Sequence, residues 1–181
     1  MATPAKEKWV IDATHSEISF KIKHLMISNV KGQFKSFDAS IYTTGDNFMS
    51  VEVDCWIDVS SVDTNNADRD KHLKSADFFD VEAHPQMSFI ANTVENVDKD
   101  GSYELWGDLT IKGIAKKIKL DVEFGGVVKD PWGNEKAVFT INGTINRKDW
   151  GLNWNTTLET GGILVGEDVK ISCEIQLMRS A

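Results

Sequence analysis

The sequence lacks an excess of positive charge. Its 20 lysine and arginine residues are outnumbered by 28 aspartate and glutamate residues, so the formal net charge is -8 and the pI lies near 5.0. Nucleic-acid grooves and generally basic membrane-docking faces both require clustered positive charge. The balance argues against a nucleic-acid partner and is typical of a soluble carrier that is monomeric or forms a homodimer.

Long apolar runs and abundant cysteine are also absent. No stretch approaches the roughly 20 apolar residues of a transmembrane helix, and no apolar run of signal-peptide length follows Met1. We therefore expect no transmembrane segment and a cytoplasmic location. The two cysteines, Cys55 and Cys173, agree with a reducing compartment, although the sequence leaves open whether they pair with each other.

Recognisable catalytic motifs are missing as well. The chain has no G-x-S-x-G elbow, no glycine-rich phosphate loop, no H-x-x-x-H helix and no C-x-x-C pair. We therefore expect no enzyme activity, no cofactor and no metal. One alternative stays open: if a barrel and a helix bring them together, His15, His24 and His72 would form a metal site, although their spacing fits no zinc motif.

What the chain does have is an alternation of apolar and polar residues with a period of two, which is typical of half-buried strands. Alternating segments cover 17–24, 30–41, 51–59, 86–94, 103–111, 116–124, 137–145 and 169–177. The segments are joined mostly by turns and lack βαβ spacing. They predict a single all-β domain over residues 1–181, an antiparallel β-barrel of about eight strands.

The alternation changes phase at two places. A shift of one residue near Lys35 and Ser36 predicts a β-bulge, which would bend the strand as barrel closure requires. In 86–94 two inward phases compete. One phase contains Met87, Phe89 and Ala91, and the other contains Ile90 and Val94.

Two segments between the predicted strands look irregular. We interpret 125–136 as a long hairpin loop. The segment 147–168 is longer and carries more apolar side chains than a solvated loop should, including Trp150, Leu152 and Trp154. Loops of this length are often lids or binding loops, but these residues would equally cover one end of the barrel.

The stretch from Arg69 to Phe89 departs from the strand pattern. We expect a helix from about Ala67 to Ala76, capped by Asn65 or Asn66. Spacing of three and four places on one face Arg69, His72, Leu73 and Ala76. This face combines a cation and an imidazole with a leucine, so the helix either plugs one end of the barrel or contacts a ligand there.

No charged residue belongs to the inward set of the predicted strands. Small residues, including Gly32, Gly107 and Gly143, are interleaved with aliphatic ones and would leave space along the barrel axis. Such a cavity would be apolar and would suit a lipid tail, because burying one methylene is worth about 0.8 kcal/mol. We expect the inward cysteines to pack as small apolar residues. The inward set is Phe20, Ile22, Val53, Cys55, Ile57, Leu105, Leu109, Ile118, Leu120, Val122, Phe139, Ile141, Ile171, Cys173 and Ile175.

Six motifs follow one another along the chain. They are D-x-x-H-S-x-I-x-F-x-I-x-H (12–24), V-K-G-Q-F-x-x-F (30–37), R-D-K-H-L-K-S-x-x-F-F-D (69–80), H-P-Q-M-S-F (84–89), G-D-L-T-I-K-G (107–113) and N-R-K-D-W-G-L (146–152). In this order they resemble the YceI-like polyisoprenoid-binding family over nearly the whole chain. The resemblance implies a lipocalin-like barrel that holds an isoprenoid chain, such as a polyprenyl phosphate or a quinone.

The resemblance also implies roles for residues within the motifs. It places at the pocket and its mouth His24, Arg69, His72, Phe79 and Arg147. Few other cations lie beside apolar motif residues, so we expect the two arginines and His72 to form the polar mouth. The predicted ligand-binding set is completed by Leu73, Phe89 and Trp150.

Three functions compete at this point. The first is a lipid carrier that transports, stores or sequesters its ligand. The second is a metal-dependent or other enzyme that uses the histidines. The third is a stress-related interaction module without a small ligand, whose barrel would be packed solid. A cavity inside the barrel would separate the first function from the third.

Overall fold

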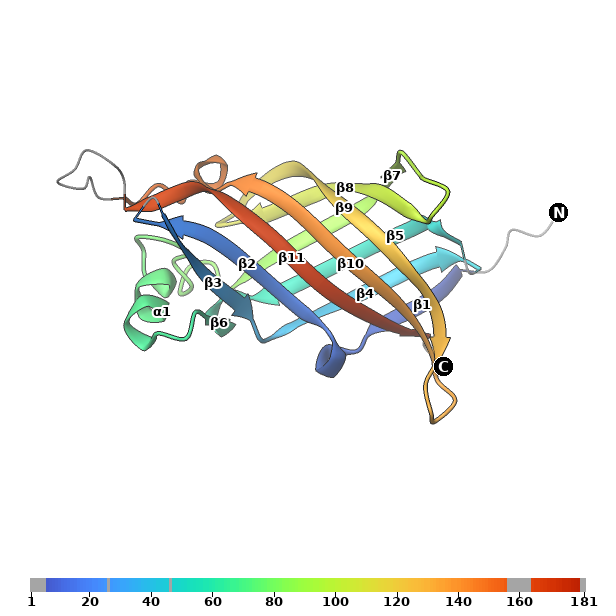
Figure 1. Ribbon diagram of the computed structural model, residues 1–181. Coiled ribbons are helices and arrows are strands. Elements are labelled where there is room, and N and C mark those ends of the chain that lie inside the picture. The colour runs from blue at the N-terminus through green and yellow to red at the C-terminus, as the bar shows by residue number, and fades with distance from the viewer. Residues whose placement is uncertain (1–5, 26, 46, 156–163, 180–181) are drawn as a thin grey trace.

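The structure is a computed structural model that describes residues 6–25, 27–45, 47–155 and 164–179. These residues form mostly β-strands, together with one α-helix and three short 3-10 helices (Figure 1). The strands are β1 (Lys6–Ile11), β2 (Glu17–His24), β3 (Ser28–Phe34), β4 (Phe37–Thr44), β5 (Asn47–Asp58), β6 (Val62–Asp63), β7 (Gln86–Glu95), β8 (Ser102–Ile111), β9 (Ile114–Lys129), β10 (Glu135–Asn146) and β11 (Val165–Arg179). The helices are η1 (Ala13–His15), η2 (Val59–Ser61), α1 (Ala67–Lys74) and η3 (Arg147–Trp150).

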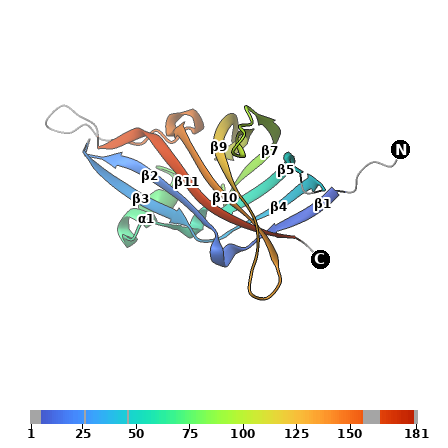
Figure 2. The same ribbon diagram turned by 45° about the vertical axis from the view of Figure 1, so that its right-hand side comes forward.

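The strands close into a barrel. The ring runs β1-β4-β5-β7-β8-β9-β10-β11, and an antiparallel pairing between β11 and β1 completes it. The predicted antiparallel barrel of about eight strands is therefore confirmed. Figure 2, turned from the first view, shows the strands wrapping around a common axis.

In two places the barrel wall is formed by a pair of strands that follow each other end to end: β1 with β2, and β3 with β4. Ile11 of β1 pairs with Leu177 of β11, and Glu17 of β2 pairs with Glu174 further along the same edge, so η1 interrupts one long strand. In the same way β3 pairs with β2 while β4 pairs with β1. At the β2–β3 end, β3 meets only the short β6 on its other side, and α1 lies beside this part of the wall (Figure 1).

The predicted bulge near Lys35 and Ser36 is wrong. β3 ends at Phe34 and β4 begins at Phe37, so the chain breaks into two strands here. The Ser36 backbone N–H donates to Ser61 Oγ at 3.0 Å, and the Ser36 hydroxyl donates to Asp58 Oδ2 at 2.7 Å. Side chains thus replace the strand hydrogen bonds that are lost at the break.

A bulge does occur in β7 and explains its ambiguous phase. The β7–β8 register shifts between Ala91 and Thr93. Before the shift Phe89 and Ala91 are buried while Ile90 is 57% exposed, and after it Val94 pairs with the buried Leu105. Each of the two competing phases is therefore correct for its own half of the strand.

The interpretation of 125–136 as a loop is also wrong for most of its length. β9 continues to Lys129 and β10 begins at Glu135, so only a tight turn separates them. Asp130 holds the turn, because its Oδ1 accepts from the backbone N–H groups of Trp132 and Asn134, both at 2.9 Å. The hairpin extends beyond the rest of the barrel wall (Figure 1).

The predicted helix is present and slightly shorter than expected. α1 runs from Ala67 to Lys74, and the Asn66 side chain accepts from the Arg69 backbone N–H at 3.1 Å, so Asn66 is the cap. The helix ends before Ala76, which is exposed and does not belong to the inward face. None of the helices in the described ranges is long and apolar enough to cross a membrane.

Candidate ligand-binding site

A cavity of about 670 Å³ lies inside the barrel. Its volume falls within the range of roughly 300 to 1,000 Å³ that is usual for small-molecule sites. Inward-facing apolar side chains such as Ile18, Phe20 and Ile22 are only half-buried, because they border this open space. The barrel is therefore not packed solid, which contradicts the structure expected for an interaction module without a ligand.

The predicted ligand-binding residues line this cavity with one exception. The lining contains Phe20, Ile22, His24, Val53, Cys55, Ile57, Arg69, His72, Leu73, Phe79, Phe89, Leu105, Leu109, Leu120, Phe139, Ile141, Arg147, Ile171 and Cys173. The exception is Trp150, which is 1% exposed and lies outside the lining. Its indole N–H donates to the Leu109 carbonyl at 2.8 Å, so it supports the wall from behind.

Aromatic side chains close the end of the cavity that lies away from α1. Phe48 contacts Trp9, Phe124 and Phe139, with ring centroids 5.0, 5.0 and 5.2 Å apart. Phe48 and Phe139 line the cavity, while the fully buried Trp9 donates through its Nε1 to Thr43 Oγ1 at 3.0 Å. These rings form an aromatic floor that is built partly from β1, a strand absent from the predicted set.

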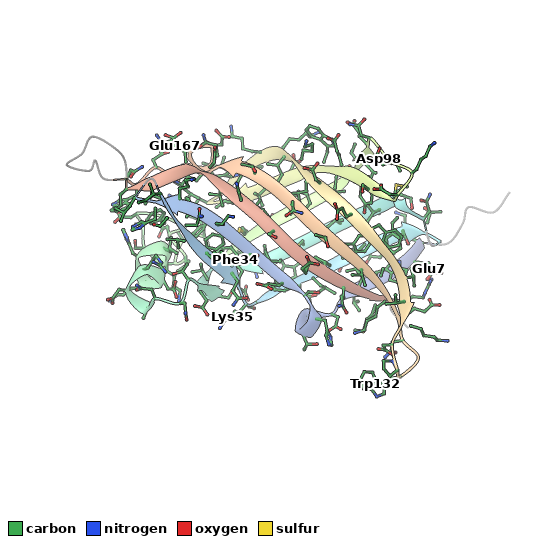
Figure 3. All side chains as sticks on the ribbon, in the orientation of Figure 1. Glu7, Phe34, Lys35, Asp98, Trp132 and Glu167 are labelled. Carbon is green, nitrogen blue, oxygen red and sulfur yellow. The ribbon has the colours of Figure 1, made fainter. Side chains whose placement is uncertain are left out.

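Polar groups gather at the opposite end of the cavity. Thr64, Asn66, Asp68, Arg69 and His72, which border the cavity there, come from α1 and the residues just before it. Lys23, His24 and Arg147 add charge from β2 and η3. Phe34, labelled in Figure 3, lies next to this end and packs on Phe79 with the ring centroids 6.1 Å apart. The cavity is thus an apolar bore with a polar mouth.

Arg147 organises one side of the mouth and is almost completely buried. Its guanidinium donates to the carbonyls of Leu152 and Trp154 on one segment and to those of Val165 and Gly166 on another, at 2.5 to 3.3 Å. Burial lowers its pKa below the usual value, although Glu167 acts in the opposite direction. Arg147 therefore joins two backbone segments and brings positive charge to the mouth.

Arg69 is placed differently, with part of its guanidinium unused. Nε donates to Thr64 Oγ1 at 2.8 Å and Nη2 to the Thr64 carbonyl at 2.7 Å. Thr64 is held in turn by Asp70, whose Oδ1 accepts from both its backbone N–H and its hydroxyl. Among the residues that the structure describes, no acceptor contacts Nη1 of Arg69. This group is available to a ligand.

His72 lies between aromatic rings at the mouth. Its Nε2 is 2.9 Å from Asp77 Oδ2, and its ring meets those of Phe78 and Trp154 edge-on, with centroids 5.1 and 4.6 Å apart. Asp77 and the two rings fix the orientation of the imidazole. His72 therefore presents an aromatic surface at the entrance as well as a polar atom.

The three histidines of the alternative metal site do not come together. His24 and His72 line the cavity, but His15 bonds to Asp12 Oδ2 at 2.7 Å and is not part of the lining. Within the described ranges, no group of three or more His, Cys, Asp or Glu side chains is arranged to hold a metal ion.

Both cysteines are free and line the cavity. Burial raises the pKa of each thiol, Cys55 and Cys173, to about 12. A thiol with such a pKa stays protonated near neutral pH and is a poor nucleophile. The structure therefore favours the packing role predicted for these residues and contains no disulfide between them.

The inward glycines do not create the cavity, contrary to the prediction. A Cβ atom on Gly32 would lie 2.4 Å from Phe20 Cζ, and one on Gly107 would lie 2.8 Å from Phe89 Cζ. On Gly143 it would lie 2.7 Å from Leu120 Cδ2. Phe20 thus covers Gly32 as aromatic residues cover strand glycines elsewhere, and Leu120 covers Gly143. At Gly107 the nearest atoms are Ala91 Cβ and the Ile90 carbonyl oxygen, both at 2.6 Å.

Comparison with known proteins places this barrel in a family. The sequence model of the YceI-like domain family matches residues 9–177 of this chain. The chain belongs to the YceI-like family. A UPF0312 protein of Staphylococcus epidermidis is 43% identical over 171 residues, covering 93% of this chain and 96% of that protein. The match to the UPF0312 protein therefore extends over nearly the full length of both chains.

Solved structures agree with the YceI-like fold. The Campylobacter jejuni YceI protein is 35% identical with a TM-score of 0.70, covering 89% of this chain and 91% of that one. A polyisoprenoid binding domain from Saccharophagus degradans has a TM-score of 0.66 at 12% identity, covering 95% of this chain and 98% of that domain. The second similarity shows a shared fold only.

Several lining residues of the YceI-like cavity were missing from the predicted set. Phe34 and Ile41 continue the inward alternation of β3 and β4, so the same pattern could have included them. Thr64 and Trp154 lie outside strands, and no periodic signal marks them. Leu158 and Ile163, apolar residues of the predicted 147–168 segment, lie outside the described residues.

Proposed function

We propose that this chain binds an isoprenoid or a similar long-chain amphiphilic lipid inside its barrel. The polyprenyl phosphates and the quinones are the two ligand classes that fit best. In this role the protein transports, stores or sequesters the lipid. The observation that carries the proposal is the polarity of the cavity: among the described lining residues, aromatic rings form the floor at one end and the charged side chains lie at the other.

This polarity sets the direction in which an amphiphile binds. The tail gains about 0.8 kcal/mol for each methylene that it buries, so it occupies the apolar bore. A charged or carbonyl head cannot be buried there without partners, and it finds cationic donors at the mouth, where no acceptor among the described residues contacts Nη1 of Arg69. The floor formed by Phe48 and Phe139 then limits the length of tail that fits.

The fold comparison supports the same ligand class. The Saccharophagus degradans domain, which has the same fold, is described as polyisoprenoid binding. The proposal for the present chain rests on its own cavity, because that domain is only 12% identical.

Lipid that copurifies with the protein provides the test. We expect native mass spectrometry of the freshly purified chain to show one lipid per chain, and organic extraction to release a prenylated molecule. Delipidated protein should take up a polyprenyl phosphate or a quinone again. A chain that carries no lipid and accepts none of these compounds would rule the proposal out.

A further inference from the structure

The turn between β2 and β3 exposes apolar side chains next to the mouth of the cavity. Ile27 is 85% exposed and Leu25 is 46% exposed. The Leu25 backbone N–H donates at 2.8 Å to the carbonyl of Leu164, a lining residue, and His24, another lining residue, directly precedes Leu25. The apolar tip, defined here as Leu25 and Ile27, is thus part of the rim of the mouth.

The backbone at this tip is unfavourable for the residue that occupies it. Leu25 has φ 55°, a left-handed conformation that glycine and asparagine adopt more readily than leucine. Leu25 thus leaves 46% of its surface exposed and occupies a backbone conformation that is costly for leucine. Residues that break local rules in this way are concentrated at functional sites.

Three lysines lie in a row behind the tip. Lys21 of β2 pairs directly with Lys31 of β3 on one side and with Lys170 of β11 on the other. Like charges opposite each other on neighbouring strands destabilise a sheet. Across the described ranges none of the three forms an ion pair, and all three border a surface hollow of about 520 Å³. This lysine row (Lys21, Lys31 and Lys170) is a local positive site on a chain of net charge -8.

The acidic residues nearby are partly neutralised. Glu167 pairs with Lys148 at 2.8 Å, and Asp63 pairs with Lys35 at 2.7 Å. Glu17, which also borders the hollow, forms no ion pair with the described residues and offsets one of the three lysine charges. Lys23, exposed between the lysine row and the tip, adds another positive charge on β2. Overall acidity argued against a generally basic docking face, but the β2–β3 hairpin is positive locally.

We propose that the β2–β3 hairpin docks the mouth of the barrel on an anionic lipid bilayer. Leu25 and Ile27 insert among the lipids, and the lysine row contacts the phosphate groups of the surface. Apolar residues combined with lysines are the usual means by which proteins attach to the membrane interface. Docking would bring the mouth against the bilayer, so that a lipid tail passes between them without crossing water. This last consequence rests on the proposed lipid-binding function, whereas docking itself does not.

The chain offers a matched control at its other end. Trp132 is 83% exposed on the β9–β10 turn, which lies away from α1 and the β2–β3 hairpin (Figures 1 and 3). Ile27 and Trp132 are both apolar, exposed and located at a hairpin tip. Neither lines the cavity, so neither substitution should alter ligand uptake.

Sedimentation with lipid vesicles tests the proposal. We expect the wild-type chain to bind vesicles of equimolar phosphatidylglycerol and phosphatidylcholine more tightly than vesicles of phosphatidylcholine alone. Ile27→Asp should weaken binding at least about tenfold, and each lysine-to-glutamine change in the row about fivefold. Trp132→Asp should leave binding unchanged. Because Ile27 is exposed, Ile27→Asp should keep the thermal midpoint of the wild type, which circular dichroism checks.

Several results would overturn the proposal. These are a wild-type chain that ignores anionic vesicles, a full effect of Trp132→Asp, and no effect of Ile27→Asp. Equal binding to both kinds of vesicle would remove the role of the lysine row. Lipid uptake, measured separately by native mass spectrometry, distinguishes the two proposals. A chain that loads lipid but does not dock contradicts only docking, and a chain that docks but never loads lipid contradicts only the carrier function.

Discussion

Lys136 Nζ lies 2.6 Å from Asp12 Oδ2, and both side chains are only 11% exposed. Asp12 lies between the end of β1 and the start of η1, and Lys136 belongs to β10. His15 and Thr14 also bond to the same carboxylate, at 2.7 and 2.8 Å. The pair therefore joins the β1–β2 break to a strand on the far side of β11.

This pair gives the first prediction, which concerns stability against pH. The hydrogen bond from Lys136 holds the pKa of Asp12 well below its usual range. The folded state therefore gains stability from Asp12 above the pKa of the unfolded chain, about 3.9, and loses this gain as the pH falls toward the folded-state value. Asp12→Asn should lower the unfolding free energy at pH 7 by about 2 kcal/mol.

Urea unfolding at several pH values checks this prediction. The difference between wild type and Asp12→Asn should shrink below about pH 4, where the wild-type carboxylate begins to lose its advantage. Exposed Asp108 provides a control, since Asp108→Asn should change stability little at any pH. A difference for Asp12→Asn that stays constant from pH 7 to pH 2 would contradict the assigned role.

The second prediction concerns the head group of the ligand. Arg69→Ala removes from the mouth the Nη1 group that no described acceptor contacts. The affinity for a polyprenyl phosphate should fall about 10- to 100-fold, because hydrogen bonds between charged groups are worth about 1.5 to 3 kcal/mol. The affinity for a neutral quinone should fall much less. Lys71→Ala, on the exposed side of α1, is the control and should change neither affinity. Equal losses for both lipids would exclude a head-group role for Arg69.

The third prediction concerns the glycine beneath Phe20. Gly32→Ala places a methyl group 2.4 Å from Phe20 Cζ, so the ring must move toward the cavity. We expect a loss of about 1 to 3 kcal/mol in unfolding free energy together with weaker lipid uptake. The double variant Gly32→Ala with Phe20→Leu should regain part of the stability, as coupled neighbours do. Strictly additive effects in calorimetry would show that the ring and the glycine are independent.

Much of the barrel could be predicted because alternation reports which face of a strand is buried. The run from Val51 to Val59 gave both the strand and its inward residues, and a side-chain cap at Asn65 or Asn66 gave the start of α1. β1 was missed, since its few residues, with Trp9 inside, alternate too briefly to be recognised. The break at Lys35 and the bulge after Ala91 depend on which strands pair, and the local sequence does not contain that information.

The candidate site divides in the same way. Inward residues of the bore follow from periodicity, and most of them line the cavity. The roles of the mouth residues do not follow from periodicity. Arg147 donates hydrogen bonds to backbone carbonyls of two separate segments, whereas Arg69 keeps one guanidinium nitrogen without a described acceptor. Whether a strand glycine leaves a hole depends on the neighbour that leans over it, as Phe20 does over Gly32.

In the proposed function the open bore of the barrel holds the tail of a lipid, and a variant that fills the bore tests this function most directly. Ile141 of β10 lines the cavity and is half-buried, whereas Thr144 of the same strand is exposed. We would titrate each tryptophan variant with a quinone and count bound lipid by native mass spectrometry, using circular dichroism to confirm folding. We expect folded Ile141→Trp to lose lipid binding and Thr144→Trp to bind one lipid per chain, as the wild type does. Undiminished binding by a folded Ile141→Trp variant would contradict the proposed function.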